Sequence, residues 1–147
     1  MANPESKQLF DKGIDALSEG KILAALSCFE KAFTIEEDPL ISSFFAFCIA
    51  KERGEVQKAI SLCNAAIKKE PGNSFHYLNL GKIYLLIKNN KEAINIFRQG
   101  LSYEENQQIG DELNKLGTRK PPIIPFLTRS NIINKYLGLI LSRLKLR

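Results

Sequence analysis

The chain has 147 residues, of which 44% are hydrophobic and 25% are charged. This length suits one compact domain or a short array of repeats, and the composition excludes a wholly disordered chain. The sequence starts without an apolar signal-peptide core and has no apolar run near the ~20 residues that a membrane-spanning helix needs. We therefore expect a cytoplasmic location. With one histidine and no CxxC motif, Cys28, Cys48 and Cys63 are expected to be buried, reduced thiols and not metal ligands.

The net charge of +5 is concentrated at the C-terminal end of the chain. Residues 118–147 contain seven basic residues and no Asp or Glu, whereas residues 1–117 contain 14 basic and all 16 acidic residues. The first part therefore carries about −2 and the tail +7. The basic residues of the tail are Arg119, Lys120, Arg129, Lys135, Arg143, Lys145 and Arg147.

In chain order, residues 6–105 divide into three similar units, at 6–39, 40–73 and 74–105. In each unit, two apolar patterns with helical spacing are separated by a break, which predicts two helices joined by a turn. Matching residues recur about 34 positions apart. They are Ala25, Ala59 and Ala93; Ala32, Ala66 and Gly100; Phe29, Cys63 and Phe97; and Gly13, Ala46 and Gly81. The small residues would let the two helices of a pair pack closely, with the larger ones filling the space beside them.

Helix-breaking residues mark the ends of the units, and a change in composition marks the start of the tail. Pro39 and Pro71 fall between units, and Asn73 or Ser74 is predicted to cap the next helix. A capping helix is predicted over 106–117, with Gly117 as its stop. After it, three prolines favour an extended segment over 118–130, and an apolar stripe among basic residues predicts a basic amphipathic helix over 131–147.

This pattern resembles the tetratricopeptide-repeat (TPR) family. The third unit carries the resemblance best, with Tyr77-Leu78-Asn79-Leu80-Gly81 and Tyr84. The resemblance covers about residues 6–105, and a proline-containing basic tail is similar to those behind short bacterial TPR arrays. The resemblance implies an all-α, right-handed solenoid of three helix-turn-helix units with a C-terminal capping helix. The first unit departs from the family pattern at Lys12 and Ala16, and the second at Ser42.

No motif of a catalytic site occurs in the sequence. There is no nucleophile elbow, zinc-protease motif, phosphate-binding loop or dinucleotide fingerprint. Cys48 and His76 are not expected to form a catalytic pair. The residues and the family resemblance both predict a protein that is not an enzyme and that needs no cofactor or metal.

The resemblance implies that the first helix of each unit lines a peptide-binding groove. The predicted groove residues are Phe10, Ile14 and Leu17, then Ser43, Phe47 and Lys51, then Leu78, Lys82 and Leu85. TPR domains that bind chaperone C-terminal carboxylates use Lys and Asn on these helices. Phe10 and Ile14 stand at the matching places of the first unit, so this sequence lacks that clamp and predicts an apolar groove.

The predicted function is a protein–protein interaction scaffold that binds a peptide or helix. The alternative is association with a membrane or another anionic surface through the basic helix at 131–147. The apolar segment from Pro121 to Leu127 could instead occupy the groove, and the last helix could mediate self-association. Nucleic-acid binding is not expected, because the basic residues are not interleaved with aromatic ones in a base-reading motif.

Overall fold

A computed structural model describes residues 1–117 of this protein. They form seven α-helices: α1 (Pro4–Ser18), α2 (Ile22–Ile35), α3 (Pro39–Arg53), α4 (Val56–Lys69), α5 (Ser74–Leu86), α6 (Asn90–Tyr103) and α7 (Gln107–Lys115). Residues 1–117 contain no strand, in agreement with the predicted all-α fold. The predicted extended segment at 118–130 and helix at 131–147, with the seven basic residues of the tail, lie outside the described residues.

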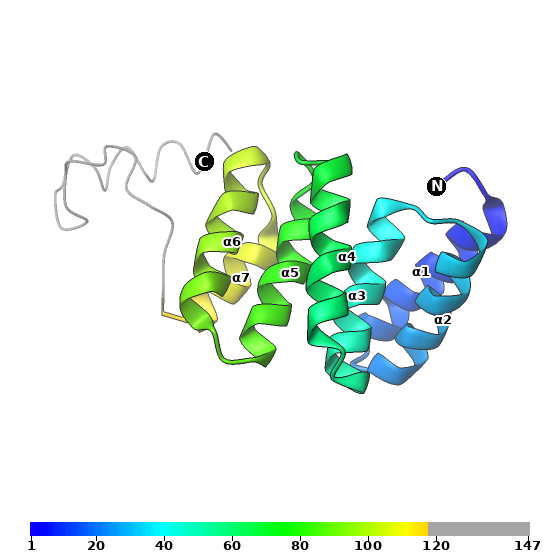
Figure 1. Cartoon of the computed structure of the whole chain (residues 1–147), viewed down its shortest axis with the longest axis horizontal. Helices are drawn as coiled ribbons and strands as arrows, with labels where there is room; N and C mark the ends of the chain where they lie inside the picture. Colours follow the sequence, from blue (N-terminus) through cyan, green and yellow to red (C-terminus); the bar gives the residue numbers. More distant parts are fainter. Residues whose placement is uncertain (118–147) are drawn as a thin grey trace, which may run out of the picture. The chain divides into compact units, whose positions relative to one another are not determined.

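The chain separates into two compact units, at residues 1–109 and 110–147. In the first unit, α1 packs on α2, α3 on α4 and α5 on α6, and Figure 1 shows these three helical hairpins following one another. α3 also packs on α2 and α5, and α4 packs on α5, so each hairpin contacts the next. This is the stacking of a helical solenoid, in which each repeat buries its apolar face against its neighbours. Helix α7 begins in the first unit and ends in the second.

Short polar side chains start the first helix of each hairpin. The side chain of Asn3 accepts hydrogen bonds from the backbone N–H groups of Glu5 and Ser6. The Asp38 side chain accepts a hydrogen bond from the backbone N–H of Leu40 at 2.8 Å. Asn73 does so for Phe75 at 3.0 Å, which makes Asn73 and not Ser74 the cap of α5. These bonds satisfy backbone donors that the first turn of a helix leaves without partners.

A carboxylate at the end of the second helix returns to the start of the first helix in two of the hairpins. Ser6 Oγ donates to Glu36 Oε2 at 2.6 Å, and Ser74 Oγ donates to Glu104 Oε1 at 2.8 Å. Hydrogen bonds from the serine hydroxyl and nearby backbone N–H groups lower the pKa of Glu36, and those from Ser74 lower the pKa of Glu104. Both carboxylates therefore tie the two ends of a hairpin together.

Glycine and phenylalanine meet where the helices of the first and third hairpins cross. A Cβ atom on Gly13 would lie 2.7 Å from Phe29 Cζ, and one on Gly81 would lie 2.7 Å from Phe97 Cζ. Both rings are fully buried. No carbon fits at such distances, so these glycines are present because the ring occupies the place of a side chain.

The second hairpin has a different pair of residues at the matching places. Ala46 and Cys63 stand there, and both are fully buried. A methyl group on one helix is thus matched with a small thiol on the other, in place of the glycine and the large ring. Burial raises the pKa of Cys48 to about 12 and raises that of Cys63 as well. All three thiols are free, but Cys28 is only partly buried, contrary to the sequence prediction.

The glycine–ring contact predicts a sharp effect for Gly81→Ala. Alanine favours a helix over glycine by about 1 kcal/mol, but forcing its methyl group into the Phe97 ring should outweigh this. We expect a net loss of about 1–2 kcal/mol in the free energy of unfolding, measured by urea denaturation.

Two variants control this experiment. Gly72→Ala should change stability by less than about 0.5 kcal/mol, because nothing lies within 4 Å of the added carbon. Adding Phe97→Leu should make Gly81→Ala less harmful than it is in the parent chain. Strictly additive losses in the double variant would contradict the proposed contact.

Candidate functional site

An open pocket of about 550 Å³ lies across the first helices of the three hairpins. Its lining residues are Phe10, Ile14, Leu17, Ser18, Ile22, Leu40, Phe44, Phe47, Phe75, Lys82 and Gln108. α1 contributes Phe10, Ile14 and Leu17, and α3 contributes Leu40, Phe44 and Phe47. In both helices the spacing is i, i+4 and i+7, which places the three side chains on one face. Most of the lining is apolar, as in pockets that bind organic ligands or peptides.

The structure brings together five of the nine groove residues predicted from the sequence. Phe10, Ile14, Leu17, Phe47 and Lys82 all line this pocket.

The other four predicted residues are not among those that line the pocket. Ser43 and Leu78 are only 0% and 1% exposed, so their expected place on the groove surface was wrong. Both are turned into the interior of the solenoid. Lys51 is exposed and Leu85 is half-buried, at places outside the pocket lining.

Two phenylalanines that the sequence analysis missed form much of the pocket floor. The Phe44 ring lies 5.5 Å from the ring of Phe10 and 5.9 Å from that of Phe75, measured between centroids. Such distances are typical of packed aromatic pairs. The i, i+4, i+7 spacing of Leu40, Phe44 and Phe47 could have indicated this face, whereas aligning repeats pointed to Ser43.

Among residues 1–117, Lys82 is the only charged residue that lines the pocket. Its Nζ lies 4.3 Å from the centroid of the Phe47 ring, a cation–π contact. The Phe47 ring itself is 6% exposed. The remaining polar groups of the lining belong to Ser18 and Gln108. The described lining of the pocket is therefore apolar along most of its length, with a cationic side chain at Lys82.

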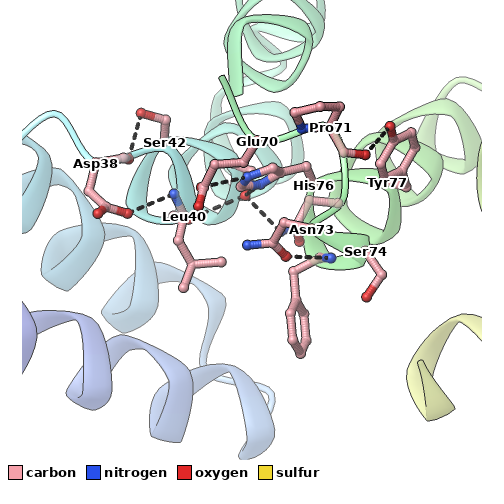
Figure 2. Close-up of polar contacts among 12 residues, drawn as sticks. Asp38, Leu40, Ser42, Glu70, Pro71, Asn73, Ser74, His76 and Tyr77 are labelled. Atoms are coloured by element: carbon pink, nitrogen blue, oxygen red, sulfur yellow. Dashed lines mark hydrogen bonds and ion pairs between the residues drawn. The ribbon is translucent and has the colours of Figure 1, made fainter. Parts of the chain in front are cut away.

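A buried polar cluster lies between the second and third hairpins. His76 Nδ1 lies 3.0 Å from Ser43 Oγ, and its Nε2 lies 3.1 Å from Glu70 Oε1. Figure 2 shows Glu70, just after α4, reaching the His76 ring at the start of α5. The contacts connect α3, α4 and α5 through hydrogen bonds as well as apolar packing.

Serine, histidine and glutamate in this order also occur in hydrolase triads. Here Ser43 is fully buried, and its hydroxyl also contacts the Leu40 carbonyl at 3.2 Å and Asn79 Nδ2 at 3.3 Å. A substrate carbonyl has no approach to this hydroxyl. In residues 1–117, no group of three His, Cys, Asp or Glu side chains could hold a metal ion. The geometry of the cluster thus favours a structural role.

His76 gives the protein a predictable response to pH. Burial lowers the pKa of His76, although Glu70 and, more weakly, Asp38 oppose this shift. Between the folded and unfolded pKa values the unfolded chain binds more protons, so lowering the pH favours unfolding. The free energy of unfolding should be level above about pH 6.5 and should fall as the pH drops below it.

Urea denaturation between about pH 7.5 and about pH 5.5 would measure this dependence. The chain has one histidine, so His76→Gln should remove most of the slope in that range. An unchanged slope in His76→Gln would show that another group is responsible.

Comparisons with known proteins agree with this geometry. A tetratricopeptide-repeat family model matches residues 77–107. A search of curated proteins gave no match. Among solved structures, the first TPR domain of Spaghetti (RPAP3) bound to an HSP90 peptide is 22% identical, with a TM-score of 0.58, over 77% of this chain and 90% of that one.

Two other structures are similar to the same extent. The second TPR domain of human RPAP3, in complex with an HSP70 peptide, is 22% identical with a TM-score of 0.56, over 78% of this chain and 97% of that one. The Sgt2 TPR domain from Aspergillus fumigatus is 17% identical with a TM-score of 0.57, over 90% of this chain and 95% of that one. Residues 77–107 thus match the tetratricopeptide repeat, and the chain has the helical-solenoid fold of the TPR domains to which it is similar.

Proposed function

We propose that this protein is a non-catalytic interaction scaffold that holds a peptide or a helix of a partner protein in the pocket across α1, α3 and α5. The observation that carries the proposal is the pocket itself, whose apolar lining comes from three successive hairpins. A surface of this kind suits a peptide with apolar side chains that are spaced to meet successive helices. The peptide complexes of the two RPAP3 domains support this mode of binding.

The apolar side chains of α1 indicate which kind of peptide the pocket would bind. Phe10 and Ile14 line the pocket, where a clamp for a C-terminal carboxylate would need polar or cationic side chains. Apolar contacts at this end should therefore supply most of the affinity. Burying a leucine-sized side chain contributes about 1.5–3 kcal/mol, so several such contacts are needed to outweigh the free-energy cost of association.

The alternative, association with an anionic membrane surface, rests on the helix predicted at 131–147. That segment lies outside the described residues and the alternative stays a prediction, as does the cytoplasmic location. None of the helices in residues 1–117 is long and apolar enough to span a bilayer.

The pocket predicts which surface changes weaken peptide binding. The full chain would be used to select binders from a library of random dodecapeptides, and one selected peptide would be labelled with fluorescein. By anisotropy, the double variant Ile14→Ala/Leu17→Ala should bind it at least about tenfold more weakly, because two apolar contacts are lost. Both residues are only partly buried, so the fold should tolerate their truncation.

Leu23→Ala/Ile35→Ala is the matched control. Leu23 and Ile35 are 68% and 38% exposed on α2, outside the pocket lining. This variant should keep the affinity of the parent chain. Equal affinities of both double variants, or a library that yields no binder, would contradict the proposed function. Circular dichroism would show that each variant is folded.

A further inference from the structure

The charges of residues 1–117 are unevenly distributed along the chain. Residues 56–103 contain seven basic and two acidic residues, whereas the rest of residues 1–117 contains seven basic and 14 acidic ones. Most of the excess positive charge lies on α4 and α6, the second helices of the last two hairpins. Their basic residues are Lys58, Lys68, Lys69, Lys91 and Arg98, and Glu92 is their one acidic residue. We call the surface made by these five basic residues the α4–α6 basic face.

The α4–α6 basic face lies away from the pocket. Both helices pack on α5, and Figure 1 shows α5 between them. Neighbouring helix axes lie about 8–10 Å apart, so the axes of α4 and α6 are at most about 20 Å apart. The five basic side chains are all exposed, and none of them lines the pocket. Lys58 and Lys69 are eleven residues apart and Lys91 and Arg98 are seven apart, which places each pair on one side of its helix.

The side chains beside these basic residues are short and polar. Ser61 and Asn64 on α4 and Asn95 on α6 are exposed. The one large exposed apolar side chain of these two helices is Tyr103, and its ring stacks on that of Tyr77, with 5.6 Å between centroids. The face therefore offers charge and hydrogen bonds, but it lacks apolar side chains that could enter a bilayer or stack on unpaired bases.

Most of the positive charge on this face is not neutralised by the described part of the chain. Within residues 1–117, no acidic side chain pairs with Lys68, Lys69, Lys91 or Arg98. Lys58 lies 3.7 Å from Glu55, and such an exposed pair is weak. Glu70, next to Lys69 in the chain, contacts His76 instead. The charge of the face is thus available to an anion from outside the domain.

We propose that the α4–α6 basic face binds the phosphate backbone of a nucleic-acid duplex without reading its sequence. Phosphates in such complexes are bound by Lys and Arg together with Ser, Asn and Gln side chains, which is the set of residues on this face. B-form DNA carries one negative charge per about 1.7 Å of its axis, so a duplex offers a phosphate to each basic residue. Backbone binding needs no base-reading motif, and it uses a different surface from the proposed peptide pocket.

Charge-matched variants of the full chain test this proposal. Lys69→Gln/Lys91→Gln/Arg98→Gln removes three charges from the face. The control, Lys12→Gln/Lys21→Gln/Lys51→Gln, removes three exposed lysines from other helices and turns. Both variants keep the seven basic residues of the tail, so any contribution of the tail is the same in both. Binding to a fluorescein-labelled DNA duplex of about 20 base pairs would be measured by anisotropy between about 50 and 200 mM NaCl.

The variant of the face should bind the duplex at least about tenfold more weakly than the parent chain and the control. The slope of log K against the logarithm of the salt concentration should be smaller by about 2–3, because each lost phosphate contact lowers it by about one. Lys69→Arg/Lys91→Arg/Arg98→Lys should keep the affinity of the parent chain, and circular dichroism would show that all variants are folded.

Three outcomes would overturn the proposal. The parent chain fails to bind the duplex at about 50 mM salt, or the face variant and the control bind it equally well. The third outcome uses vesicles of phosphatidylcholine and phosphatidylserine: if the three residues are needed for binding to the vesicles but not to the duplex, the face is a membrane-binding surface. All of the substituted residues lie outside the lining of the pocket, so these results leave the proposed peptide binding untouched.

Discussion

The contact between a glycine and a buried phenylalanine ring sets how closely two helices of one repeat approach. Gly13 meets Phe29 in the first hairpin, and this ring is also part of the wider packing. The Phe29 centroid lies 5.6 Å from that of Phe10 and 5.7 Å from that of Phe44. The aromatic floor of the pocket is therefore continuous with the contact that closes the hairpin. Because close-packed interiors transmit strain, a change at the glycine should also be felt at the pocket.

One departure from the repeat shapes both the pocket and the polar interior. Ser6 and Ser74 bind the carboxylates of Glu36 and Glu104, thirty residues further along the chain in each case. The second hairpin has Leu40 and Glu70 at this spacing. Leucine cannot bond a carboxylate, and Glu70 instead contacts His76 of the next hairpin, while Leu40 lines the pocket. The loss of one hydroxyl thus accompanies a new link between repeats and a more apolar wall.

Sequence reasoning succeeded where the repeat period alone determines the structure. Small residues at fixed offsets identified the hairpins and the places where the helices cross, whereas the groove residues Phe10, Ile14 and Leu17 were predicted from the family resemblance and the alignment of the repeats. It failed at Ser43 and Leu78, because the rotation of each helix about its own axis is set by packing against its neighbours. The hydrogen bond between Glu70 and His76 could not be predicted from the sequence either, because it depends on the path of the turn at Pro71.

The pocket and the core share side chains, which limits how binding can be altered. Phe44 is 7% exposed and touches three other rings, so it belongs as much to the fold as to the pocket. Truncating a buried phenylalanine costs about 3–5 kcal/mol, a large part of the stability of a small domain. If the proposed binding is specific, the partly buried residues Ile14, Leu17 and Lys82 are the places where it can be changed without unfolding the domain. Of these, Lys82 alone is charged, so its replacement changes the charge of the proposed binding pocket while leaving the packed aromatic rings intact.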